Sequence, residues 1–213
     1  MRLFLFLLIF IHAELTAQQF TFVFLNSRSD KAELPKEEVD ALMQQHLANI
    51  ERLASEGKLI VAGPFEGGGG IFIMKTPSIE EAREWLSSDP AIQANRWNLE
   101  LFLLTPRIGG VCSIPSTNEM VSYTFFRFLP NTTKFNVQQS PQSYKKHSEY
   151  LKSLSTTGNV VAEGIFGDYE GGILIMKGEV DQQLIDLDPG ITETVLVAER
   201  KKIWVGKGSF CEN

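Results

Sequence analysis

The chain has 213 residues, a formal net charge of −6, and lysines and arginines that are scattered apart from the cluster Arg200-Lys201-Lys202. Because a nucleic-acid-binding face needs a basic stripe or patch, this pattern argues against nucleic acid as a partner. The length allows two small domains.

The N-terminus has the order of a secretory signal peptide. Arg2 precedes nine apolar residues, 3–11, and the small-residue pair Thr16-Ala17 follows. A membrane-spanning helix needs about 20 apolar residues, so this run is too short for a permanent anchor. We therefore expect a signal peptide over 1–17, a mature chain that begins at Gln18, export to the periplasm or the medium, and no stable membrane insertion after cleavage.

The next hundred or so residues predict a strand, a helix, a hairpin, a helix and a strand. An aromatic and β-branched run predicts the first strand over 20–25. Pro35 opens a helix that extends to about Glu56 before Gly57. Its apolar stripe has helical spacing and consists of Val39, Leu42, Met43, His46, Ile50 and Leu53.

The hairpin joins strands over 59–62 and 71–74 through the glycine run 67–70, which is better explained as a turn than as a phosphate-binding loop. Ser78 is expected to cap a second helix that ends before Asp89-Pro90, and the last strand covers 99–104. The predicted order is therefore β-α-β-β-α-β.

The second half of the chain repeats this order. Residues 46–65 return as 147–166 at an offset of 101, with the His, two Gly and the final Phe all retained. Asp89-Pro90 returns as Asp188-Pro189 at an offset of 99. We expect strands over 121–129, 160–162, 173–176 and within 194–205, a helix over about 142–157, and a shortened helix over about 180–187. A period near 100 residues indicates a duplicated domain rather than a solenoid unit.

β-α-β-β-α-β is the ferredoxin-like split βαβ arrangement, whose antiparallel sheet carries helices on one face only. The other face of the sheet must be buried, and we expect the sheet of the second copy in the same chain to pack against it. We therefore predict an α+β chain of two ferredoxin-like domains, 18–105 and 119–213 with a C-terminal tail, joined by a linker over 106–118. The two domains are expected to pack sheet to sheet as an intramolecular dimeric α/β barrel, which is an internal pseudo-dimer. Whether the chain also forms a larger oligomer stays open at this point.

The residues resemble those of the YCII-related family. The resemblance lies in His46 ahead of the helix end, Ala62-Gly63-Pro64-Phe65, the glycine-rich turn, Glu81-Ala82-Arg83 and Asp89-Pro90. It is closer in the first copy than in the second, where Ile165 replaces Pro64 and the second helix is shorter. Members are similar to dimeric α/β-barrel proteins, including the muconolactone isomerase type. The resemblance implies that fold and a His–Asp pair as the usual proposed active site, although most members have no assigned reaction.

The candidate catalytic residues are His46 and Asp89, with His147 and Asp188 as a weaker second pair. Both histidines lie on the apolar stripe of a helix, and both aspartates precede a proline ahead of the last strand. A carboxylate beside an imidazole raises the pKa of the ring while burial lowers it, so the balance can suit proton transfer near neutral pH. The alternative is structural: a His on an apolar face is often a core residue, and Asp-Pro is often a turn.

Three further features stay open at this point. Cys112 and Cys211 form a disulfide or remain free thiols, and they lack the spacing of a zinc site. Glu163, which replaces Ala62 in the second copy, is interpreted as an exposed edge residue in preference to a cleft carboxylate. Asn131-Thr132-Thr133 is a glycosylation sequon only in a host that has the machinery.

Two functions are compatible with these features. One is a lyase or isomerase that needs neither metal nor cofactor and uses His46 with Asp89 on a small apolar, aromatic or lactone-like substrate. The other is a non-catalytic module that binds a small apolar ligand or a partner between helix and sheet. An open pocket with an accessible imidazole favours the first.

Overall fold

The computed structural model describes residues 19–113 and 119–211, so the predicted signal peptide lies outside the described residues. The first unit consists of β1 (Phe20–Ser27), α1 (Lys36–Ser55), β2 (Leu59–Pro64), β3 (Gly70–Met74), α2 (Ile79–Leu86), α3 (Pro90–Gln93) and β4 (Trp97–Ile108). The second consists of β5 (Met120–Pro130), α4 (Ser140–Leu154) with a 3₁₀ turn (Ser155–Thr157), β6 (Val160–Phe166), β7 (Gly172–Met176), α5 (Gln182–Asp186), α6 (Pro189–Thr192) and β8 (Leu196–Gly206).

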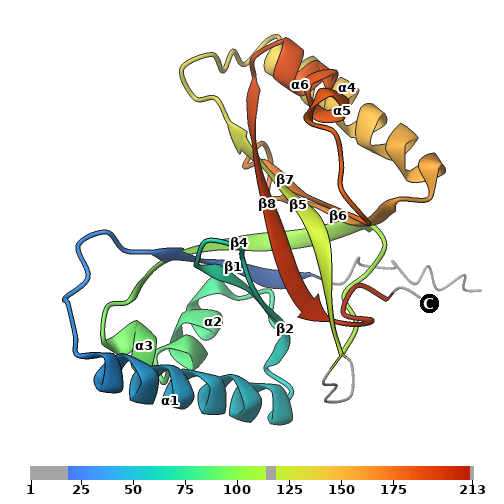
Figure 1. Cartoon of the computed structure of the whole chain (residues 1–213). Coiled ribbons are helices and arrows are strands. Elements are labelled where there is room, and N and C mark those ends of the chain that lie inside the picture. The colour runs from blue at the N-terminus through green and yellow to red at the C-terminus, as the bar shows by residue number, and fades with distance from the viewer. Residues whose placement is uncertain (1–18, 114–118, 212–213) are drawn as a thin grey trace, which may run out of the picture.

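The strands form one antiparallel sheet of eight in the order β2-β3-β1-β4-β6-β7-β5-β8. Its two ends meet, because Phe65 just beyond β2 bridges to Ile203 of β8 and the Glu66 amide donates to the Lys202 carbonyl oxygen at 2.9 Å. The sheet thus closes into a barrel, with α1–α3 on one side and α4–α6 on the other (Figure 1). The predicted α+β fold class, two ferredoxin-like units in an intramolecular dimeric α/β barrel, is confirmed.

The two units join along two seams, β4 with β6 and β2 with β8, and each seam has a glycine at the same place in the repeat. A Cβ on Gly63 would lie 2.5 Å from the Trp204 carbonyl oxygen, and a Cβ on Gly164 would lie 2.7 Å from Leu104 Cδ1. Real Cβ atoms do not approach other atoms so closely. At Gly63 the obstacle is backbone, so a side chain there would push the seam apart, whereas at Gly164 the Leu104 side chain would have to move and the Thr105 carbonyl oxygen would lie 3.0 Å away. The repeated glycines are explained by this close approach.

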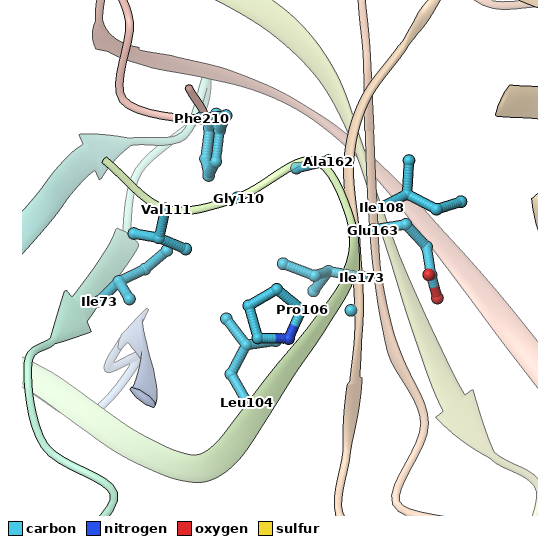
Figure 2. A pocket seen from close by; sticks show the side chains of 11 residues that line it. Ile73, Leu104, Pro106, Ile108, Gly110, Val111, Ala162, Glu163, Ile173 and Phe210 are labelled. Atoms are coloured by element: carbon cyan, nitrogen blue, oxygen red, sulfur yellow. The ribbon is translucent and has the colours of Figure 1, made fainter. Parts of the chain in front are cut away.

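The barrel interior is filled with aromatic side chains. Phe22 and Phe24 of β1 point inward and lie near Phe125 of β5 and Phe166 of β6, with ring centres 5.3–6.4 Å apart across the two units. A remaining void near the connector measures about 10 Å³ (Figure 2). Since a single water needs roughly 10–15 Å³, this part of the barrel has no room for an organic ligand.

Glu163 corrects a sequence prediction, since it is 3% exposed and not on an exposed edge. The prediction treated β6 as an outer strand, but β6 lies between β4 and β7 in the closed barrel. The carboxylate points away from Phe210 and Val111 (Figure 2) and accepts hydrogen bonds from Arg107 of β4 at 3.0 and 3.1 Å, while Arg107 also donates to Ser148 of α4 at 2.9 Å. Glu163 therefore ties the second unit to the first.

Strand β4 is longer than expected and continues into the segment predicted as a linker, because Thr105 and Pro106 pair with Ile165 and Gly164 of β6. None of the helices in the described part of the chain has the length and apolar character needed to cross a bilayer.

A disulfide joins Cys112, after β4, to Cys211 near the C-terminus, with the Cα atoms 5.1 Å apart. The alternative of two free thiols is therefore wrong. The bond fixes a C-terminal segment whose Phe210 is 2% exposed and packs against Tyr123 in the barrel core, with ring centres 6.2 Å apart. It closes a loop with a sequence separation of 99 residues around nearly the whole second unit.

Reduction of this disulfide is expected to lower the free energy of unfolding by about 2–4 kcal/mol, since a bridge across a long loop restricts the unfolded chain. Urea unfolding with and without dithiothreitol measures the difference. A Cys112→Ser/Cys211→Ser double variant should match the reduced protein and not respond to reductant. Identical unfolding midpoints for oxidised and reduced wild type would contradict the expectation.

Candidate functional site

The first candidate pair is held between α1 and α3. His46 lies on the inward face of α1 and is 7% exposed, while Asp89 is fully buried. Asp89 is the N-cap of α3: its Oδ1 accepts hydrogen bonds from the amides of Ala91 at 2.9 Å and Ile92 at 3.2 Å, and Pro90 occupies the first turn. Asp-Pro therefore begins a short helix that the sequence prediction missed, a common arrangement because proline at N1 loses no helical hydrogen bond.

The structure brings His46 and Asp89 into direct contact, with 2.8 Å between Nδ1 and Oδ2. Asn49, one turn further along α1, donates to the same carboxylate oxygen at 3.1 Å. Because an ionised carboxylate can only accept hydrogen bonds, the proton of the neutral ring is assigned to Nδ1. No described residue hydrogen-bonds His46 Nε2, so this nitrogen is left as a proton acceptor.

The surroundings of Asp89 favour its ionised form. Burial on its own would raise the pKa of this carboxyl, but the hydrogen bond and charge of His46, the Ile92 amide and Asn49 together hold the pKa below its usual value. Asp89 is therefore a carboxylate at neutral pH, oriented to stabilise a protonated His46 ring.

The second candidate pair repeats the contact with different neighbours. His147 Nδ1 lies 2.6 Å from Asp188 Oδ2, and Asp188 Oδ1 accepts from the Gly190 amide at 2.7 Å as the N-cap of α6. Tyr150 stands where the first unit has Asn49, and its hydroxyl donates to the Leu184 carbonyl at 2.5 Å. Burial, and then the charge of Asp188, raise the pKa of Tyr150.

A cavity of about 120 Å³ lies beside the first pair. The residues that line it lie in the loop before α1, in the first half of α1, in α3 and at the start of β4. They are Lys31, Val39, Leu42, Met43, Ala91, Arg96 and Trp97. The Trp97 ring centre is 6.2 Å from that of His46, and Ala91 contributes an amide to Asp89. His46 itself is not among the lining residues, so the cavity adjoins the imidazole and does not enclose it.

The indole N–H of Trp97 lacks a hydrogen-bond acceptor among the described residues. Within the described residues, its indole Nε1 is the buried side-chain polar atom that has no hydrogen-bond partner. An unsatisfied buried donor costs about 1–3 kcal/mol, so native structures retain one only where something else compensates for it. The atom belongs to a residue that lines the cavity beside His46.

The corresponding region of the second unit differs. Asn95 and Thr194 both have left-handed backbone, with φ of 53° and 60°, which places Leu196 at the position of Trp97. Leu196 is 2% exposed and has no side-chain donor. Glu193 binds the ammonium of Lys146 at 2.5 Å and accepts a hydrogen bond from Ser143, both on α4. The first unit therefore has a donor at this position that the second lacks.

The described part of the chain contains no group of three or more His, Cys, Asp or Glu side chains that could hold a metal ion. Sequence reasoning found both His–Asp pairs but missed Asn49, Lys31, Arg96 and Trp97. Of these, Asn49 could have been found, because a residue three positions after His46 shares its helix face.

Comparisons with protein families and with solved structures bear on this architecture. Residues 20–100 match the model of the YCII-related domain, which spans the first unit up to the middle of β4 and includes both His46 and Asp89. A variant of chlorite dismutase from Candidatus Nitrospira defluvii is similar at a TM-score of 0.52 and 10% identity, over 88% of this chain and 91% of that one.

A proposed monooxygenase from Fusobacterium nucleatum subsp. nucleatum is similar at a TM-score of 0.47 and 10% identity, over 90% of this chain and 94% of that one. No curated protein matches the sequence. At 10% identity the likeness to the chlorite dismutase variant shows the fold alone. The YCII-related match is the finding that bears on the first unit, and the recognition made from its sequence motifs is confirmed.

In the variant Asp89→Asn, the free energy of unfolding is expected to depend less on pH in the acid range than it does in the wild type. The folded pKa of Asp89 is below the unfolded value of 3.8, so its ionisation stabilises the fold above about pH 4, and this stabilisation is lost as the pH falls through the folded pKa. At pH 7 the variant should be less stable by about 3 kcal/mol, the magnitude for breaking a buried pair, and the gap should narrow below about pH 4.

Urea unfolding at pH 7, 4 and 3 measures this gap. Asp168→Asn, which removes an exposed carboxylate of the second unit, is the control and should keep the wild-type pH dependence. A constant gap between wild type and Asp89→Asn across this range would show that the charge of Asp89 is not what stabilises the pair.

Proposed function

We propose that the protein is an exported acid–base enzyme of the lyase or isomerase kind, with its site at His46 and Asp89 in the first unit. The observation that carries the proposal is the geometry of His46: Nδ1 is fixed by a buried carboxylate at 2.8 Å, and Nε2 has no partner among the described residues. A ring held in one tautomer, with its other nitrogen free, is poised for general base catalysis.

The chemistry needs no group beyond those present. Nε2 takes a proton from an acidic C–H of the substrate, the resulting imidazolium is stabilised by Asp89, and the same proton is returned. Return to a different atom of the substrate is an isomerisation, and return to a departing group is an elimination. General acid–base catalysis of this kind contributes roughly 10²–10⁴-fold to a rate.

The adjoining cavity limits the substrate. A cavity of about 120 Å³ is slightly smaller than the roughly 150 Å³ cavity that accommodates benzene in an engineered protein. Its walls include the apolar side chains of Val39, Leu42, Met43 and Ala91. We therefore propose a small apolar or aromatic substrate of about one ring, which would occupy the cavity with its reacting carbon toward His46.

Export is part of the proposal and has two supports. The first 17 residues follow the pattern of a signal peptide. The Cys112–Cys211 bond is of the kind that persists in oxidising compartments. N-terminal sequencing of protein recovered from the envelope or medium of the host should give Gln18 as the first residue, and intact Met1 on cytoplasmic protein would contradict export.

A second candidate function is ligand binding without chemistry. It is favoured by one observation: His46 is 7% exposed and does not line the cavity. In that case His46 and Asp89 serve to pin α1 to α3, and the cavity holds a ligand that is never converted.

Substitution of the two histidines separates the candidates. Small aromatic and lactone compounds are first screened for thermal stabilisation of the protein, since a ligand that binds the native state raises its stability. Compounds that bind are then tested in D₂O for protein-catalysed deuterium incorporation by NMR. We expect His46→Ala to lower the exchange rate by at least about 10²-fold, while His147→Ala leaves it close to wild type.

Folding of both variants is checked by circular dichroism and urea unfolding, and each serves as the other's control. Equal losses in the two variants, or a larger loss from His147→Ala, would overturn the assignment to the first unit. Binding without exchange for every compound that binds would favour the non-catalytic candidate.

A further inference from the structure

We infer that the site beside His46 is selective for a small carboxylate, an anion attached to about one apolar ring, over its neutral analogue. This inference rests on the proposed location of the site and adds the charge of its ligand. It comes from the distribution of charge around the cavity, which differs from that of the protein as a whole.

Two cationic side chains line the cavity, Lys31 and Arg96, and none of its lining residues is acidic. The protein carries a net charge of −6, so a cavity with two cations and no acid is not an average piece of its surface. The remaining walls are apolar or aromatic. Such a cavity is complementary to an amphipathic anion, whose ring packs against the apolar part and whose charge lies at the basic part.

Neither cation is neutralised by a carboxylate in the part of the chain that the structure describes. The Lys31 ammonium forms no ion pair with a described residue, and its neighbour Asp30 is paired instead with Arg28, at 2.7 Å. The Arg96 guanidinium donates to the Ala32 carbonyl oxygen at 2.6 Å and has no carboxylate partner in the described part of the chain. That hydrogen bond also fastens the loop bearing Lys31 to the start of β4.

Trp97 supplies an independent indication. Its buried Nε1 lacks a partner, and its side chain lines the same cavity. An indole N–H can only donate, so the group that would satisfy it is an acceptor such as a carboxylate or carbonyl oxygen. The residues that line this one cavity thus include two cations without an ion-pair partner among the described residues and a tryptophan whose indole donor lacks an acceptor, a combination that is complementary to an oxygen anion.

The charge of Asp89 does not oppose such a ligand. Its carboxylate is fully buried and is already engaged by His46, Asn49 and two backbone amides. The charge of Asp89 is therefore compensated within the protein, whereas the two cations at the cavity form no ion pair with a described residue.

Benzoate and benzamide test the inference, because they have nearly the same shape and differ in charge. Binding is measured by isothermal titration calorimetry at low salt, and the site is located by the shifts of the histidine ring protons in NMR. Benzoate is expected to bind about tenfold more tightly than benzamide and to shift the His46 resonance and not that of His147. The preference should shrink as salt screens the cations.

Lys31→Gln removes one cation from an exposed position and should weaken benzoate binding about fivefold, with a clearly smaller effect on benzamide binding. Lys134→Gln removes the same charge from an exposed position of the second unit and is the matched control, expected to bind benzoate as wild type does. Equal affinities for the two compounds, absence of binding by both, or equal losses in the two lysine variants would each overturn the inference.

Failure of the inference and failure of the proposed function give different results. If benzoate is preferred but no carboxylate that binds exchanges a proton with solvent, the anion site stands and catalysis fails. If neutral compounds bind and are turned over in a His46-dependent manner with no preference for carboxylates, catalysis stands and the anion site fails.

Discussion

Each four-stranded sheet of this protein has two apolar faces but helices enough to cover only one. In β1, Phe22 and Phe24 point to one face, while Val23 and Leu25 point to the other and pack under the helices. Exposed phenylalanines over a whole sheet face would be strongly unfavourable in water, at about 25 cal/mol for each Å² of apolar surface. The second unit covers that face, so the stability of each unit depends on the other.

This mutual cover determines where a ligand can bind. The two sheets also join each other, through the β4–β6 ladder on one side and the Phe65–Ile203 bridge on the other, so they close into a barrel whose interior is filled by side chains from both units. The space between each sheet and its own helices is shaped differently. There residues of α1, α3 and β4, with the loop before α1, line a cavity beside the buried pair of His46 and Asp89. The cavity to which we assign the proposed site therefore lies outside the barrel, in the layer of helices.

The sequence predicted the features that repeat. Glycines, histidines and Asp-Pro at matching offsets predicted two similar units, and the need to cover the second face of each sheet predicted the barrel. The prediction that Glu163 lies on an exposed edge was wrong. In an isolated ferredoxin-like sheet β6 is an edge strand, but here it pairs with β4 of the first unit and is no longer at an edge. The helices α3 and α6 were missed since four residues are too few to show a period.

Other features depend on tertiary approach and have no sequence pattern. Whether Cys112 reaches Cys211 is decided by how the C-terminal segment packs Phe210 into the barrel. The two cations at the cavity could not be predicted from the sequence either. Lys31 and Arg96 lie 65 positions apart in the chain, and they come together because Arg96 donates a hydrogen bond to the loop before α1. A lone lysine in a polar loop gives no sign of such a role.

The two His–Asp pairs show how one arrangement can serve two purposes. In both units the aspartate caps a short helix and binds the histidine of the long helix, so the pair fastens these helices together whatever else it does. In the second unit Leu196 and the Glu193–Lys146 pair occupy the surroundings, and a structural role accounts for what is present. In the first unit the same pair lies beside a cavity with unpaired cations and an unpaired indole donor, which packing alone does not require. Both pairs thus hold two helices together, and the additional polar groups around the first pair are the reason that the proposed site is assigned to the first unit.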